Sequence, residues 1–224
     1  MAKKKKKPAQ ADAVPTATTQ RSPETPMNRN DYNPALRDDL VAGPCIGLLE
    51  LASVAKGVEV ADGILWEANV ELLFSSPVQP GKYVVLFTGS VQDVTSAVRH
   101  GAAAAGSDLV DQLLIHQVHE QVEAALRRNG GHIDGALDAV GVVETTTVAA
   151  SIVSADVALK TATVDLLDLR IANGLGGKSF YTLTGPVADV RSAVTAGARA
   201  AQEAGRLARE VVIARPHPEL SRHL

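Results

Sequence analysis

The sequence predicts an α+β fold of two tandem ferredoxin-like βαββαβ units, each an antiparallel sheet with helices packed on one face. The first observation is an internal repeat: the run from Ile46, IGLLELASVAKGVEVADGILWEANVELL, returns 94 residues later from Val140 as VGVVETTTVAASIVSADVALKTATVDLL. The second is that KYVVLFTGSVQDVTSAVRHGA from Lys82 matches KSFYTLTGPVADVRSAVTAGA from Lys178, at a spacing of 96. Two copies of one unit imply internal pseudosymmetry. The third is the βαββαβ order within each copy, which places two helices against one small sheet.

Hydrophobic patterning assigns the elements of the first copy. Its opening apolar run is typical of a buried strand, and Ser53 is suited to cap the helix that follows, where apolar residues recur at helical spacing. The segment SSPVQPGK is predicted to be a loop, because its prolines and glycine disfavour regular structure. The predicted elements are strand Cys45–Leu51, a helix from Ser53 to Asn69, strands Val70–Phe74 and Tyr83–Thr88, helix Val91–Ala105, strand Leu113–Val118 and a polar helix Glu120–Arg128.

The second copy repeats this order. Small residues crowd the last helix of each copy, in HGAAAAG and AGARAAQEAG, which predicts close packing of that helix on its sheet. The predicted elements are strand Val140–Glu144, helix Val148–Ala162, strands Val164–Ile171 and Phe180–Thr184, helix Val187–Glu203 and strand Glu210–Ala214.

The first 44 residues differ in composition from the rest. They carry a net charge of +3 against −6 for the remainder, include the run Lys3–Lys7, and contain no Leu, Ile or Phe before Leu36. Such a segment buries too little apolar area to offset the entropy lost on ordering. We therefore expect a disordered basic tail over residues 1–44, a first domain over 45–130 and a second over 136–220. The tail is either simply solvated or docks on an acidic partner: nucleic acid, a membrane surface or an enzyme carried as cargo.

Composition excludes several classes of protein. The single cysteine, Cys45, rules out an intramolecular disulfide framework and fits a reducing compartment. No apolar run reaches the roughly 20 residues that span a bilayer, so we expect no membrane partner and a cytoplasmic location. With 3 Phe, 3 Tyr and 1 Trp, the chain has little to stack on bases, and no nucleic-acid partner is expected.

No combination of residues predicts catalysis, and we expect no enzyme activity, no cofactor and no metal. The segment from Ala172 to Ser179 echoes a phosphate-binding loop but lacks the first glycine and precedes a strand rather than a helix. The pair His116 and His119 has no further ligand at metal-binding spacing. Glu50 and Glu144 recur at the ends of the first strands, which indicates a structural role, as a cap of the following helix or an interface hydrogen bond.

At this point the residues resemble a known family. The first copy, with IGLLEL, VADGILWEANVELL and KYVVLFTGSVQDVTSAVRHGAAAA, and the second, with SADVALKTATVDLL, NGLGGKS and VVIARPHPEL, are similar to the bacterial microcompartment (BMC) shell domain. The likeness covers residues 45 to about 220. The order of elements resembles the unpermuted, single-layer, tandem-domain trimeric type (BMC-T).

The resemblance implies a structural role and a set of site residues. Three chains would form a pseudohexameric facet tile of a microcompartment shell, with a central pore for small metabolites, beside other hexameric, trimeric and pentameric shell proteins. The loop between the second and third strands of each copy would line the pore: Ser75, Ser76, Pro77, Val78 and Gln79 in one, Asn173, Gly174, Leu175 and Gly176 in the other. Tile-edge contacts would involve Trp66, Lys160, Arg215 and His217.

Two alternatives belong to other classes of protein. The first is a pore that binds a cofactor or conducts electrons. An iron–sulfur cluster needs thiolate ligands, and neither pore segment contains a cysteine, which disfavours that version. The second is an enzyme or regulator built from a pair of ferredoxin-like domains, for which no site constellation is present.

Overall fold

The computed structural model describes residues 45–126, 137–171 and 175–221. The predicted basic tail, residues 1–44, lies outside this part of the chain. The elements of the first unit are strand β1 (Cys45–Leu51), helix α1 (Val54–Glu67), strands β2 (Val70–Val78) and β3 (Lys82–Gly89), helix α2 (Val91–Ala105), a 3-10 turn (Gly106–Asp108), strand β4 (Leu109–Ile115) and helix α3 (Glu120–Leu126). Those of the second are β5 (Ala139–Thr145), α4 (Val148–Thr161), β6 (Asp165–Ile171), β7 (Ser179–Gly185), α5 (Val187–Glu203), β8 (Leu207–Ala214) and α6 (Pro218–Ser221).

Both units have the predicted βαββαβ order and form separate four-stranded antiparallel sheets. The strand orders are β2-β3-β1-β4 and β6-β7-β5-β8, so the two sheets are topologically identical. Even the irregularities repeat: a register shift follows Glu50 where β1 pairs with β4, and another follows Glu144 where β5 pairs with β8. The fold class predicted from the repeat is therefore confirmed.

Two strand predictions were wrong. The second strand continues through the segment predicted as a loop, because Ser75 to Val78 pair with Val85 to Lys82 of β3. Pro77 is tolerated there because β2 is an edge strand, where a missing N–H leaves no neighbouring strand unpaired. The last strand of the first unit is β4, Leu109–Ile115, and not Leu113–Val118.

The helices of each unit cover one face of its sheet, which we call the inner face. Ser53 caps α1 as predicted, accepting a hydrogen bond from the Lys56 amide at 3.3 Å. The predicted close packing of the small-residue helices is also present. A Cβ on Gly101 of α2 would lie 2.3 Å from Leu49 Cδ1, and one on Gly197 of α5 would lie 2.1 Å from the Tyr181 hydroxyl. Glycine is required at both positions because no side chain fits.

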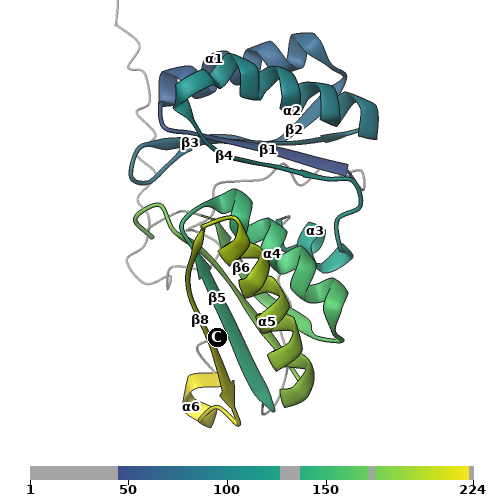
Figure 1. Ribbon diagram of the computed structural model, residues 1–224, viewed down its shortest axis with the longest axis vertical. Coiled ribbons are helices and arrows are strands. Elements are labelled where there is room, and N and C mark those ends of the chain that lie inside the picture. The colour runs from purple at the N-terminus through teal and green to yellow at the C-terminus, as the bar shows by residue number, and fades with distance from the viewer. Residues whose placement is uncertain (1–44, 127–136, 172–174, 222–224) are drawn as a thin grey trace, which may run out of the picture.

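Helix α4 lies between the two sheets. It covers the inner face of its own sheet and also packs on the opposite, outer face of the first sheet, against β1 and β4 (Figure 1). One continuous apolar cluster therefore joins the units: Ile46, Leu48, Leu86 and Leu113 from the first sheet, with Val148, Ala149 and Ile152 from α4. The two domains are held together by a shared core.

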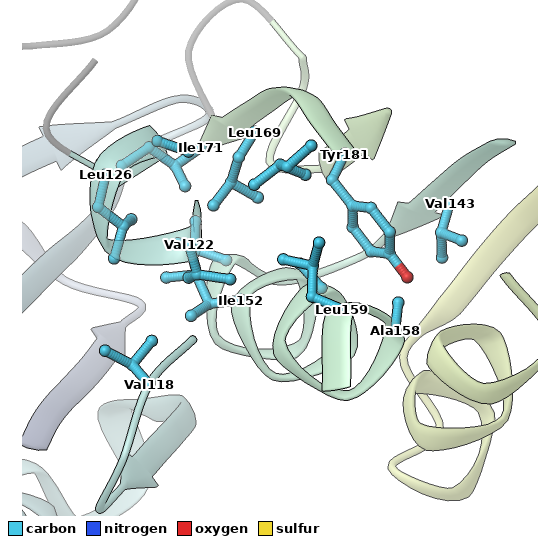
Figure 2. Close-up of a cluster of buried hydrophobic side chains, with 14 of the residues drawn as sticks. Val118, Val122, Leu126, Val143, Ile152, Ala158, Leu159, Leu169, Ile171 and Tyr181 are labelled. Atoms are coloured by element: carbon cyan, nitrogen blue, oxygen red, sulfur yellow. The ribbon is translucent and has the colours of Figure 1, made fainter. Parts of the chain in front are cut away.

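Helix α3 follows the first unit in sequence but packs on the second. It contacts α4 and β6. The Gln121 side chain binds the backbone at the start of β6, donating to the Val164 carbonyl at 3.2 Å and accepting from the Leu166 amide at 2.7 Å. Figure 2 shows Val122 and Leu126 directed toward Leu169 and Ile171 of β6 and Ile152 of α4. The helix is thus amphipathic rather than polar all round, and it widens the contact between the domains.

No helix in the described ranges is long and apolar enough to cross a membrane.

Candidate functional site

The hairpin ends between the second and third strands contain the residues predicted to line a pore. In the first unit Ser75, Ser76, Pro77 and Val78 belong to β2, and Gln79 begins the tight turn that Gly81 closes by donating to the Val78 carbonyl at 3.0 Å. In the second unit Leu175 and Gly176 form the turn before β7, where the Lys178 amide donates to the Leu175 carbonyl at 3.2 Å. Asn173 and Gly174 lie outside the described residues.

The structure brings the two hairpin ends together. Lys82 Nζ, at the start of β3, donates to the Gly177 carbonyl at 3.0 Å, although the residues are 95 apart in sequence. A Cβ on Gly177 would lie 2.8 Å from Pro80 Cδ, and its φ of +87° is one that glycine adopts readily. The two hairpin ends thus meet at close range, through the side chains of Lys82 and Pro80 and the backbone of Gly177, which places the described pore residues of the two copies near one another.

A buried polar cluster lies beside this contact. The fully buried Glu50 carboxylate accepts from Lys82 Nζ at 2.5 Å and from the backbone amide of Val148 at 2.8 Å. Val148 is the first residue of α4, where unpaired amides and the helix dipole favour a negative charge. Glu50 does not cap α1, the helix that follows it; the alternative prediction, an interface hydrogen bond, is confirmed, because its carboxylate binds the first residue of α4 in the other domain.

The second copy repeats half of this cluster. Glu144 pairs with Lys178, the residue just before β7, at 3.0 Å, and the two residues are equivalent in strand register to Glu50 and Lys82. Here both side chains are substantially exposed rather than buried. The residue equivalent to Val148 is Val54, the first residue of α1, which belongs to the first domain.

The same contrast holds for the apolar residues of the two first helices. Val148, Ile152 and Leu159 of α4 are 0%, 0% and 5% exposed against the outer face of the first sheet and neighbouring residues. Val54, Val58 and Leu65 of α1, at the equivalent positions, are 40%, 54% and 46% exposed. The outer face of the second sheet likewise presents Val211, which is 44% exposed. The chain therefore makes this helix-on-sheet contact once, between α4 and the first sheet. It carries a second copy of each surface, on α1 and on the outer face of the second sheet.

The predicted tile-edge residues occupy two kinds of position: near the end of the first helix of each copy, and just after the last strand. Lys160 Nζ donates to Asp156 Oδ2 at 2.6 Å and to the Gln117 carbonyl at 2.5 Å, so this lysine bridges the two domains. His119 completes the arrangement by donating its amide to Asp156 Oδ1 at 2.7 Å. In the other copy the position of Lys160 is taken by Trp66, which is 85% exposed.

Arg215 and His217 follow β8 as Gln117 and His119 follow β4. Both are exposed, and His217 Nδ1 accepts from the Glu219 amide at 3.1 Å just as His119 Nδ1 accepts from the Gln121 amide at 3.2 Å. Arg215 has a φ of +51°, and its amide donates to the Asp138 carbonyl at 2.7 Å. The turn after the last strand is therefore a repeated structural motif.

The side chains present are poor ligands for a redox centre. The thiol of Cys45 is fully buried in β1, away from both hairpin ends, and burial raises its pKa, which disfavours the thiolate that cluster iron binds. Within residues 45–126, 137–171 and 175–221, no three His, Cys, Asp or Glu side chains are grouped so as to hold a metal ion.

Comparison with known families shows to which family the chain belongs. A model of the BMC domain matches residues 45–118 and again residues 139–216. The chain belongs to the BMC-domain family. The two matches coincide with the β1–β4 and β5–β8 units, so each sheet with its two helices is one BMC domain.

Individual relatives agree with a tandem arrangement of BMC domains. The chain is 41% identical over 179 residues to the bacterial microcompartment shell protein PduT of Citrobacter freundii, covering 80% of this chain and 96% of PduT. A crystal structure of a microcompartment protein from Desulfitobacterium hafniense shares 46% identity, covers 80% of this chain and 98% of its own, and superposes with a TM-score of 0.69. The major carboxysome shell protein CsoS1A of Halothiobacillus neapolitanus matches 38% of this chain and 91% of itself, at 35% identity over 89 residues.

Sequence reasoning missed the residues that join the BMC domains. None of Lys82, Asp111, Thr147 and Arg206 was predicted to contact the other domain. Thr147 donates to Asp111 Oδ2 at 2.5 Å, and Arg206 Nη2 donates to the Val110 carbonyl at 2.7 Å. The one available signal was the repeat itself, since residues that differ between two copies of a unit identify where the copies have different neighbours.

Proposed function

We propose that the protein is a structural, non-enzymatic shell protein of a bacterial microcompartment, and that three copies close into a pseudohexameric tile with a central pore. The observation that carries the proposal is the duplicated contact surface. Helix α4 is buried on the outer face of the first sheet, while α1 and the outer face of the second sheet present the same two surfaces with exposed apolar residues among the described part of the chain. Docking α1 of one chain on the second sheet of the next repeats the contact already made within the chain.

Such a contact is heterologous, because it joins two different surfaces. Heterologous contacts build closed rings when the rotation between units closes and filaments when it does not. Family membership favours closure, with six BMC domains from three chains reproducing a hexagonal outline. In that ring every hairpin end would meet its neighbour as Lys82 and Gly177 do within the chain.

The ring of hairpin ends would border the pore. The proposed lining comprises Ser75 to Gln79 from one copy and residues 173–176 from the other, alternating around the axis. Hydroxyls, an amide side chain and backbone amides are suited to small polar metabolites, since pore selectivity depends on diameter and on the hydrogen-bonding groups that line it. The alternative, a pore that conducts electrons through a cluster, is disfavoured by the buried Cys45.

The mass of the purified protein in solution tests the assembly. We expect three times the chain mass of 23.4 kDa by light scattering, and a colourless protein. A monomer would contradict the tile, and a coloured trimer with bound metal would favour the electron-conducting alternative. Negative-stain microscopy should show flat hexagonal particles of uniform size.

Replacing Arg215 tests the proposed tile edge. Arg215→Ala is expected to leave the trimer mass unchanged and to reduce the formation of extended sheets, because Arg215 is exposed beyond β8. Single exposed charges contribute only about 0.2–1 kcal/mol, so the effect should show as a several-fold higher protein concentration needed for sheets. Lys160 is less informative, since its ammonium also joins the two domains.

The matched control is Arg199→Ala, which removes an exposed arginine that pairs with Glu203 on α5. It should leave sheet formation unchanged. Loss of the trimer in Arg215→Ala would instead assign this arginine to the contact between chains.

A further inference from the structure

An ion pair joins the two domains within the chain at one end of their contact. Arg206, just before β8, lies 3.5 Å from Asp111 Oδ2 on β4, measured from its Nε. The same carboxylate accepts from the Thr147 hydroxyl at 2.5 Å, and Arg206 also binds the Val110 carbonyl. The first domain thus supplies the negative charge of this contact and the second domain the positive charge.

Strand register identifies the equivalent residues in the other copy. Glu50 pairs with Asp111 across β1 and β4, and Glu144 pairs with Arg209 across β5 and β8, so Arg209 is the counterpart of Asp111. The Ala52 amide donates to the Asp108 carbonyl at 2.8 Å, and the Thr146 amide donates to the Arg206 carbonyl at 2.9 Å. Asp108 is therefore the counterpart of Arg206. Both charges are reversed between the copies.

We propose that Arg209 of one chain pairs with Asp108 of the next, so that the contact between chains carries the same ion pair as the contact within the chain, with its polarity reversed. The inference rests on the proposed trimer and specifies how its chains recognise one another. Arg209 is exposed and Asp108 is half-buried in the described structure, so both are accessible to a neighbouring copy. One long and one short side chain face each other in both contacts, which keeps the separation of the charged groups similar.

The adjoining hydroxyls fit the reversal. Thr147 donates its hydroxyl hydrogen to Asp111 within the chain. Its counterpart between chains is Ser53, the cap of α1, whose oxygen is able to accept from the Arg209 guanidinium. The hydroxyl at this position therefore donates to a carboxylate in the contact within the chain and accepts from a guanidinium in the proposed contact between chains.

In the described residues the exposed surfaces are α1 and the outer face of the second sheet, so the contact between chains joins a first domain to a second one. The Arg209–Asp108 pair adds electrostatic complementarity that fixes the register of this contact. The Glu50–Lys82 and Glu144–Lys178 pairs have the same polarity in both copies. The ion pair at the Asp and Arg positions instead reverses its polarity between the two contacts.

Charge exchange between the two positions tests the proposal. Arg209→Asp and Asp108→Arg are each expected to weaken one contact roughly fivefold, and three contacts per trimer multiply to about a hundredfold in its association constant. The double variant, Asp108→Arg with Arg209→Asp, should recover most of this loss. Sedimentation equilibrium at low and high salt would measure the constants, and the loss in the single variants should shrink as salt screens the charges.

The controls separate the possible failures. Arg199→Asp makes the same charge change on α5, the helix that packs on the inner face of the second sheet, and should not alter the association constant. Denaturant unfolding of each variant would show that the chain remains folded. A wild-type protein that is monomeric overturns the trimer itself. A trimeric wild type whose single variants associate normally, or whose double variant shows no recovery, overturns the ion pair between chains while leaving the trimer intact.

Discussion

Val58→Asp is expected to give a folded monomer, whereas Ile152→Asp, at the equivalent position of the other copy, is expected to unfold the chain. Val58 is 54% exposed on α1, so within one chain its carboxylate remains solvated. In the proposed trimer it would face the second sheet of the next chain, where an unpaired charge costs several kcal/mol. Ile152 is fully buried in the apolar core that joins the two domains, and its replacement combines about 2–5 kcal/mol of lost packing with the same charge penalty.

Light scattering and denaturant unfolding together measure both outcomes. Val58→Thr serves as the control, because it preserves the side-chain shape, adds no charge and should leave most of the protein trimeric. A Val58→Asp protein that stays trimeric would show that α1 does not contact another chain. A Val58→Asp protein that unfolds would show that α1 already has a partner within its own chain.

The second large effect concerns the buried glutamate at the domain contact. Glu50→Ala should lower the free energy of unfolding by about 3 kcal/mol, because it leaves the Lys82 ammonium and the Val148 amide without their acceptor. Urea unfolding, followed by far-ultraviolet circular dichroism, measures the change. Since Glu50 links the two domains, the single cooperative transition is also expected to broaden.

Glu50→Gln is the informative control for charge. The amide oxygen keeps an acceptor for the Val148 N–H and removes only the ionic part, so a loss of about half that of Glu50→Ala is expected. The second-copy variant Glu144→Ala should have little effect on a monomer, because Glu144 pairs with Lys178 in partly exposed surroundings. A loss below about 1 kcal/mol for Glu50→Ala would mean that water replaces the carboxylate at no net cost.

The elements were predictable because their patterns are local. Helix α5 was predicted to the residue, and Ser53 was identified as a cap, since apolar spacing and capping act within a few neighbouring residues. Strand β4 was misplaced because Asp111 and Gln112 interrupt its apolar run. The partner that makes Asp111 acceptable there is Arg206, 95 residues further along the chain, which no local window contains.

The candidate site was predictable only in part, for the same reason. Resemblance to the family located the hairpin ends, but the strand character of Ser75–Val78 depends on pairing with β3 at the sheet edge. Val58 and Ile152 are equally apolar in sequence. Their difference in exposure arises because only α4 lies between two sheets, and that follows from the order in which the two copies are joined.

The position of α4 has a consequence during synthesis on the ribosome. The first domain is complete in sequence at Ile115, but the helix that covers its outer face ends at Thr161. At a synthesis rate of about 5–20 residues per second, the apolar surface around Leu48 and Leu86 stays uncovered by α4 for several seconds. The nascent chain is therefore most prone to aggregate in that interval, and slower translation of residues 116–161 should lower the yield of soluble protein more than equal slowing after residue 161.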